Sequence, residues 1–85
     1  MNSFEYIIRD ENGLHARPAG LLVKQAKSLS SKITLECRGK SASLKKILAV
    51  MGLGVKCGDT VKVSAEGKDA EADLQKIKAF LEENF

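Results

Sequence analysis

Residues 13–18, Gly13-Leu14-His15-Ala16-Arg17-Pro18, mark the start of the first helix, and the rest of the fold is assigned around them. The preceding Asn12-Gly13 pair is typical of a turn. A proline in the first helical turn lacks only an N–H that would have no partner within the helix. Apolar residues then recur at helical spacing, at Ala19, Leu22, Val23, Ala26 and Leu29. We therefore predict a helix over about residues 16–28.

The sequence on both sides of this helix predicts four strands and two further helices. Strand patterns cover residues 4–9, 32–37, 40–43 and 60–66, and the last of these alternates with Val61, Val63 and Ala65 facing inward. Ser43 is predicted to cap a short helix that runs through about Met51, and Asp69 to cap a final helix. That final helix places Ala70, Leu74, Ile77 and Leu81 on one face.

The order of these elements is βαββαβα, which predicts an α+β fold. Strands with one apolar face and helices with one apolar stripe pack most economically as two layers. We expect a four-stranded, mainly antiparallel sheet with three helices on one face. Residues 1–85 are expected to form a single domain, since the chain leaves little room for a second.

His15 is the only histidine of the chain and lies two residues before Arg17. The amino end of a helix offers unpaired N–H groups and a positive dipole end, which favour a bound anion. The dipole disfavours an imidazolium, so we expect a neutral His15 that is available as a nucleophile. Most lone histidines are surface or capping residues, but the neighbouring arginine, proline and Asn-Gly turn favour a phosphoryl-accepting role here.

Composition and charge exclude several other classes of protein. No apolar run approaches the roughly 20 residues of a membrane span, and no signal sequence is present, so we expect a cytoplasmic protein. The net charge of +3 is too small to indicate a nucleic-acid partner, and few aromatic residues are available for stacking on bases. Cys37 and Cys57, with one histidine, cannot make a zinc site and are predicted to be reduced thiols that pack as small apolar residues. No metal or other cofactor is predicted.

The short second helix carries more apolar surface than a helix of its length needs on one side. Two alternatives remain open from the residues alone. Either these side chains all pack in the core, or Ile47, Leu48 and Met51 stay partly exposed as a docking patch for a partner. Leu21, beside the buried stripe of the first helix, has the same status.

Three motifs, taken in order, resemble the HPr family of histidine-containing phosphocarriers of the bacterial phosphoenolpyruvate-dependent sugar phosphotransferase system. They are residues 12–19 (NGLHARPA), 39–45 (GKSASLK) and 50–54 (VMGLG). The resemblance covers essentially the whole chain and implies an open-faced β-sandwich. It implies that His15 accepts a phosphoryl group from enzyme I, on Nδ1, and passes it to the IIA component of a sugar permease. Arg17 and the first-turn amides of Ala16 and Arg17 would hold the phosphate.

The resemblance also implies where partners bind and that the protein is a relay and not a turnover enzyme. Leu21, Lys24, Lys27, Ile47, Leu48 and Met51 match the positions that contact partners in this family. A monomer is the expectation for a shuttling relay of this size. A binding module that regulates a partner on the same scaffold, without phosphotransfer, is the main alternative function.

One residue departs from the pattern of the family. Many relatives carry a regulatory serine where this chain has Lys46, which cannot be phosphorylated by a serine kinase. We expect serine-based regulation at this position to be absent. Ser41 and Ser43 are nearby, but Ser43 is assigned to the helix cap.

Overall fold

Within residues 2–85, the part of the chain that the computed structural model describes, four strands pair side by side into one sheet. They are β1 (Ser3–Ile7), β2 (Lys32–Cys37), β3 (Lys40–Ser43) and β4 (Thr60–Glu66). Their order across the sheet is β1-β4-β2-β3, and all of these pairings are antiparallel. The late strand β4 therefore lies between the first two strands of the sequence.

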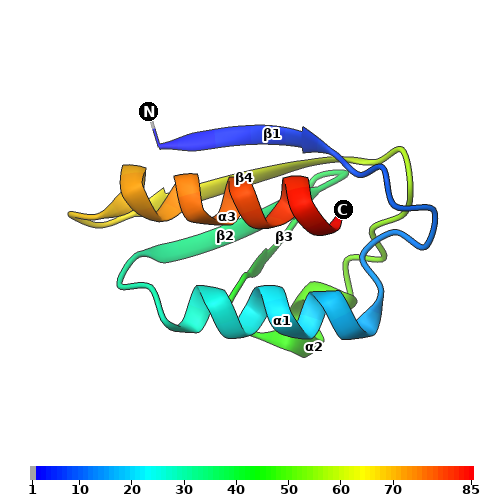
Figure 1. The fold of residues 1–85 in the computed structure, drawn as a ribbon, viewed down its shortest axis with the longest axis horizontal. Helices are drawn as coiled ribbons and strands as arrows, with labels where there is room; N and C mark the ends of the chain where they lie inside the picture. The colour runs from blue at the N-terminus through cyan, green and yellow to red at the C-terminus, as the bar shows by residue number, and fades with distance from the viewer. Residues whose placement is uncertain (1) are drawn as a thin grey trace.

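Three helices cover one face of this sheet in the described part of the chain (Figure 1). They are α1 (Ala16–Lys27), α2 (Ile47–Met51) and α3 (Ala70–Asn84). Helix α3 packs against β4 and β1, while α1 packs against α2 and α3. The apolar faces predicted for the strands and for the first and last helices are buried between the layers. The predicted α+β open-faced sandwich is confirmed, and its sheet is antiparallel at each pairing.

Helix α2 begins later than predicted, and Ser43 does not cap it. Leu44 is fully buried in the turn after β3 and donates its backbone N–H to the carbonyl of Ile33 at 2.9 Å, so this residue is still bonded to β2. The Ser43 hydroxyl instead accepts the N–H of Lys45 at 3.2 Å, in a turn that precedes the helix. Lys46 occupies the N-cap position, and its side chain makes no capping hydrogen bond. The prediction for Ser43 was wrong because Leu44 stays paired with β2.

Asp69 precedes α3 as predicted, but its side chain does not bond to the helix. Its carboxylate accepts the hydroxyl of Ser30 at 2.8 Å. One turn later, the buried Asp73 accepts both the hydroxyl of Ser31, at 2.5 Å, and its backbone N–H, at 3.1 Å. The start of α3 is thus fixed to the loop that follows α1 by two serine–aspartate pairs.

Strand β1 ends two residues earlier than predicted because the chain turns toward the end of α3. The N–H groups of Arg9 and Asp10 donate to the carbonyl oxygen of Phe85, at 2.6 and 2.8 Å. Figure 1 shows the result: the segment between β1 and α1, the amino end of α1, the loop that precedes β4 and the end of α3 gather at one end of the molecule.

Both cysteines are free, but only Cys37 is buried, so the prediction of a packed apolar residue was wrong for Cys57.

Candidate functional site

His15 occupies the N-cap position of α1, with an extended backbone (φ −85°, ψ 166°) and no capping hydrogen bond from its side chain. The first hydrogen bond of the helix runs from the N–H of Ala19 to the carbonyl of His15, at 3.0 Å. The amides of Ala16 and Arg17 precede this bond and have no acceptor among residues 2–85. Pro18 has no N–H to satisfy. The imidazole therefore lies beside two free backbone donors at a positive helix end.

Two residues that the sequence analysis missed hold the imidazole. The carboxylate of Asp10 lies 3.5 Å from Nε2 of His15. The ring of Phe85 meets the imidazole edge-on, with centroids 6.4 Å apart and planes at 74°. The His15 side chain remains 40% exposed, so an incoming group can reach it. Asp10 could have been suspected from its place in the turn before His15, whereas nothing in the sequence indicates a contact with Phe85.

The turn before His15 is fixed from two sides. The Asp10 carboxylate also accepts the N–H of Asn12 at 2.8 Å, and the Asp10 carbonyl accepts the N–H of Gly13 at 2.9 Å. Gly13 has φ +62°, and a Cβ there would lie 2.5 Å from the carbonyl oxygen of Val55. Only glycine fits this close approach. Leu14 then donates its N–H to the same Val55 oxygen at 3.1 Å, which sets the backbone that enters His15.

Arg17 lies in the first turn of α1 with an exposed side chain. Within residues 2–85 its guanidinium has no hydrogen-bond or ion-pair partner. A guanidinium offers several donors in a planar fork that matches the oxygens of a phosphate. The structure therefore leaves a cation two residues after His15 that is not engaged elsewhere in the described chain.

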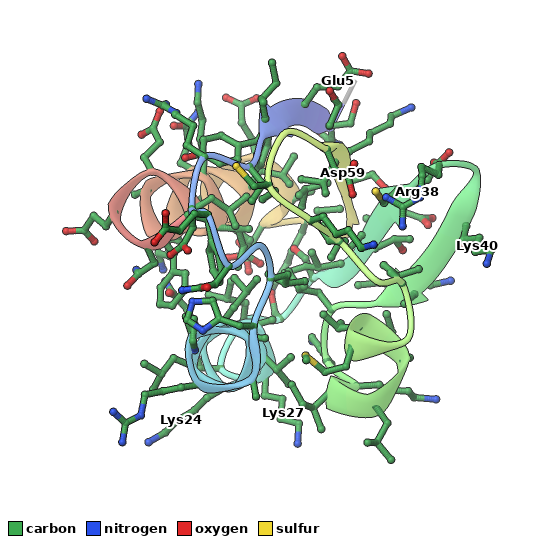
Figure 2. The ribbon with its side chains drawn as sticks, turned by 90° about the vertical axis from the view of Figure 1, so that its right-hand side faces the viewer. Glu5, Lys24, Lys27, Arg38, Lys40 and Asp59 are labelled. Atoms are coloured by element: carbon green, nitrogen blue, oxygen red, sulfur yellow. The ribbon has the colours of Figure 1, made fainter. Side chains whose placement is uncertain are left out.

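The six residues predicted for partner binding lie on α1 and α2, which pack side by side. We call this set the docking patch: Leu21, Lys24, Lys27, Ile47, Leu48 and Met51. Leu21 is 52% exposed, Ile47 37% and Leu48 85%, while Met51 is half-buried against the core. Core packing alone does not account for Leu48. Figure 2 shows Lys24 and Lys27 projecting from the side of α1 that faces away from β1.

The sequence and fold of this chain are similar to those of known phosphocarriers. Residues 2–83 match the sequence model of the family described as "PTS HPr component phosphorylation site". Phosphocarrier protein HPr of Mycoplasma capricolum subsp. capricolum is 44% identical over 78 residues, which cover 92% of this chain and 88% of that protein. The chain belongs to the HPr family. HPr proteins are phosphocarriers of the phosphotransferase system and not turnover enzymes.

Solved HPr structures share the fold. A mycoplasma histidine-containing phosphocarrier protein superposes with a TM-score of 0.92 at 41% identity, covering 95% of this chain and 92% of that one. An HPr dimer from Thermoanaerobacter tengcongensis gives a TM-score of 0.77 at 41% identity, covering 92% of this chain and 90% of that one. The HPr fold and the ordered motifs identified in the sequence therefore agree.

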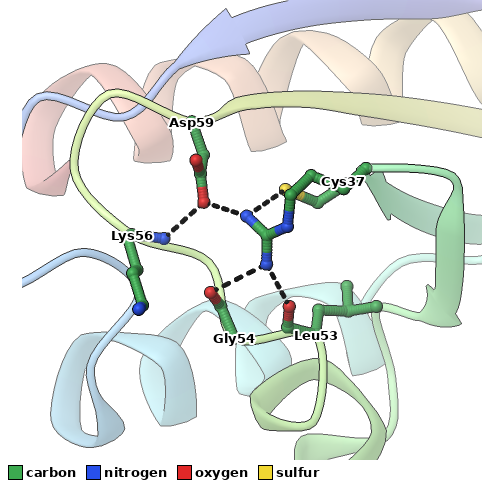
Figure 3. Close-up of polar contacts among 6 residues, drawn as sticks. Cys37, Leu53, Gly54, Lys56 and Asp59 are labelled. Atoms are coloured by element: carbon green, nitrogen blue, oxygen red, sulfur yellow. Dashed lines mark hydrogen bonds and ion pairs between the residues drawn. The ribbon is translucent and has the colours of Figure 1, made fainter.

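This HPr-family chain also contains a polar cluster that the sequence analysis did not find. Arg38 lies between the Asp59 carboxylate, the thiol of Cys37 and the backbone of the loop that precedes β4 (Figure 3). A hydrogen bond from the Lys56 N–H, and then Arg38, hold the pKa of Asp59 below its ordinary value. Burial raises the pKa of the Cys37 thiol, although the neighbouring Arg38 opposes that shift.

Neither a metal site nor a membrane helix is found in the described part of this HPr-family chain. Among residues 2–85, no group of three or more histidine, cysteine, aspartate or glutamate side chains is placed to hold a metal ion. None of the helices formed by these residues is long and apolar enough to cross a membrane.

Proposed function

We propose that His15 accepts a phosphoryl group on Nδ1 from the phosphohistidine of enzyme I and donates it to the IIA component of a sugar permease. The observation that carries this proposal is the placement of the imidazole. One ring nitrogen faces the Asp10 carboxylate, and the ring lies at a helix end with two free amides. Transient phosphorylation of this kind makes the protein a stoichiometric relay in the cytoplasm.

Asp10 selects the nitrogen that reacts. A proton on Nε2 of His15 is attracted to the Asp10 carboxylate, and this tautomer leaves the lone pair on Nδ1. That lone pair attacks the phosphorus of the donor phosphohistidine. The new Nδ1–P bond forms as the donor P–N bond breaks, and the bonding electrons return to the donor imidazole. No water or external oxidant takes part, and the Nε2 proton stays on His15 beside Asp10.

The helix end stabilises the product and the transition state. The transferring group carries negative charge on three oxygens, and the amides of Ala16 and Arg17 and the Arg17 guanidinium supply donors for it. The helix-end contribution is about 0.3–2 kcal/mol. A moderate value suits a relay, because a carrier that bound its phosphoryl group too tightly could not release it to the next protein.

The docking patch supplies the surface that partners recognise. Exposed leucines beside lysines fit a partner surface with an apolar centre and an acidic rim. Enzyme I and IIA would use this one surface in turn, because both must reach the same His15. We propose that the relay acts as a monomer, so that the patch is free. Sedimentation equilibrium of the free protein tests this against the dimeric state of two relatives.

The test is direct phosphorylation. Incubation with enzyme I, phosphoenolpyruvate and Mg²⁺ should add one phosphoryl group that is labile in acid and stable in base. The His15→Ala variant should gain none. Nitrogen-15 NMR of the histidine ring should place the group on Nδ1. Phosphorylation of His15→Ala, or a phosphoryl group on Nε2, would contradict the proposed mechanism.

A further inference from the structure

Arg38 adopts a backbone conformation that costs an arginine free energy. The β2–β3 hairpin turns at Arg38-Gly39, with φ +51° and +78°, between the paired residues Cys37 and Lys40. Two positive φ angles in a two-residue loop are typical of a type I′ turn, in which Asn-Gly and Gly-Gly are preferred. The left-handed conformation costs a residue with a Cβ about 1–2 kcal/mol. A residue persists in such a conformation when contacts with its surroundings offset the cost.

The guanidinium of Arg38 holds both ends of the segment 53–59, which we call the 53–59 loop (Figure 3). At one end, Nη2 donates to the carbonyl oxygens of Leu53, at 2.8 Å, and Gly54, at 3.0 Å. At the other end, Nη1 donates to the carboxylate of Asp59. That carboxylate also accepts the N–H of Lys56 at 2.8 Å, so the loop is closed on itself.

The 53–59 loop in turn supports the segment that leads to His15. The Val55 carbonyl accepts the N–H of Leu14 at 3.1 Å, in the contact that requires glycine at position 13. Farther along the loop, the Asp59 carbonyl accepts the N–H of Ile8 at 2.9 Å. The N–H of Gly58 donates to the carbonyl of Ile8 at 2.8 Å. Residues 8 and 14 are therefore both fixed to a loop that Arg38 closes.

We propose that Arg38 is a positioning residue of the phosphoryl-acceptor site. By closing the 53–59 loop, it fixes the turn between residues 8 and 14, and with it the Asp10 carboxylate and the entry of the backbone into His15. The inference rests on the proposed function of His15. A lysine cannot replace Arg38, because one ammonium group lacks the planar fork that reaches two carbonyls and a carboxylate together.

The experiment compares Arg38→Asn with Arg38→Lys and a control. Asparagine suits the left-handed turn, so Arg38→Asn keeps the hairpin and removes only the fork. Ser31→Ala is the control, since it removes a buried hydrogen bond to Asp73 and lowers stability without touching the 53–59 loop. For each protein, we would measure the rate of phosphorylation by enzyme I and phosphoenolpyruvate, hydrogen exchange of the Leu14 amide, and the ring-nitrogen shifts of His15.

Both Arg38 variants should be phosphorylated about 10-fold more slowly than the unchanged chain, because small displacements of a reacting group cost this much or more. The variants should lower kcat for phosphorylation by enzyme I, and they should leave KM for the carrier unchanged. The Leu14 amide should exchange faster, and the His15 ring shifts should move. Ser31→Ala should leave the phosphorylation rate and the His15 ring shifts at their original values below its unfolding temperature, and it should speed exchange of the Leu14 amide by no more than its loss of global stability does.

Two outcomes would overturn the positioning role of Arg38, and a third would overturn the proposed function of His15. Phosphorylation of Arg38→Asn at the original rate would overturn the positioning role, and so would an equal slowing in Ser31→Ala. If the unchanged chain accepts no phosphoryl group, the proposed function fails. In that case the Leu14 exchange and the His15 shifts decide alone whether Arg38 positions the turn, and unmoved values would overturn it.

Discussion

The Asp10 carboxylate lies 3.5 Å from Nε2 of His15 and at the same time accepts the N–H of Asn12, so the residue that forms the turn also faces the imidazole. Because Asp10 makes both contacts, the conformation of the turn can affect the reactivity of His15. The turn holds Asp10 in place, and Asp10 favours the tautomer that exposes Nδ1. The imidazole thus contacts a carboxylate held by the local backbone, and it also packs edge-on against the Phe85 ring.

Asp10→Asn should slow phosphorylation of His15 without abolishing it. An asparagine can still accept the N–H of Asn12, but it cannot offset positive charge on the imidazole. Partly exposed ion pairs contribute about 1 kcal/mol or less, which corresponds to a decrease of about two- to fivefold in rate. Stopped-time phosphorylation assays measure the rate, and nitrogen-15 NMR should show a larger share of the Nδ1–H tautomer. An unchanged tautomer ratio would contradict the role of Asp10.

Leu48→Ala should weaken partner binding and leave stability unchanged. Its side chain is 85% exposed, so truncation removes little buried area from the folded chain. At the centre of an interface, such a residue can contribute about 2 kcal/mol, or roughly a 30-fold change in dissociation constant. Calorimetric titration with enzyme I and with IIA measures this effect.

Ile7 provides a matched control for the docking patch. It is 58% exposed, close to the 52% of Leu21, but it lies on β1 and not on α1 or α2. Leu21→Ala should weaken binding of both partners, whereas Ile7→Ala should not. Equal losses in the two variants would mean that the apolar surface of α1 and α2 has no special part in docking.

Lys46 should block the serine-based regulation known for HPr proteins. Lys46 occupies the N-cap position of α2. The resemblance to the HPr family implies that the regulatory serine of relatives lies at this position. Incubation with the kinase that modifies that serine, and ATP, should yield no phosphoserine in this segment. Lys46→Ser is the positive control and should be modified. Phosphorylation of Ser41 or Ser43 in the unchanged chain would contradict this prediction.

The patterns that predicted the fold are local, and those that failed depend on contacts distant in sequence. The alternation of residues 60–66 and the stripe at Ala70, Leu74, Ile77 and Leu81 predicted β4 and α3, because one repeating face decides each element. The cap assigned to Ser43 failed because the pairing of Leu44 with Ile33 is not visible from neighbouring residues.

The candidate site shows the same division. His15 and Arg17 were predicted as site residues from one short motif, whereas the contact between His15 and Phe85 joins residues that are distant in the sequence. The Arg38–Asp59 pair likewise depends on how the β2–β3 hairpin meets the loop before β4. A periodic pattern carries no information about either contact. Sequence reasoning therefore proposed a reacting group and missed the residues that contact its side chain.

Ser31→Ala should destabilise the fold. Asp73 is buried and accepts both the hydroxyl and the N–H of Ser31, so the variant leaves a buried carboxylate with one donor fewer. The expected loss is about 1–3 kcal/mol in the free energy of unfolding. Denaturant titration measures this loss. Ser30→Ala removes the similar but exposed bond to Asp69 and should cost about 0.5 kcal/mol or less, so equal losses would contradict the role of burial.

The contribution of Asp59 to stability should depend on pH in one direction. The Lys56 N–H and Arg38 hold the pKa of this carboxyl below its ordinary value in the folded chain. The folded chain therefore binds the proton more weakly than the unfolded chain, whose value is about 3.9. The stabilising effect of the Asp59 carboxylate should be complete at pH values above the unfolded pKa. It should be lost as the pH falls through the pKa of Asp59 in the folded chain, which is lower. The difference in unfolding free energy between the unchanged chain and Asp59→Asn should thus be constant from neutral pH to about pH 5 and shrink below about pH 4.

Arg38→Met shows which group causes that pH dependence. The second comparison sets Arg38→Met against the double variant Arg38→Met, Asp59→Asn. If the Lys56 N–H is the larger cause of the lowered pKa, most of the pH dependence of their stability difference should persist, because this backbone donor remains. Urea titrations at several pH values measure both differences. A difference that grows as the pH falls would contradict the direction of the shift. If the pH dependence disappears completely in the Arg38→Met background, the guanidinium, and not the loop backbone, lowers the pKa of Asp59.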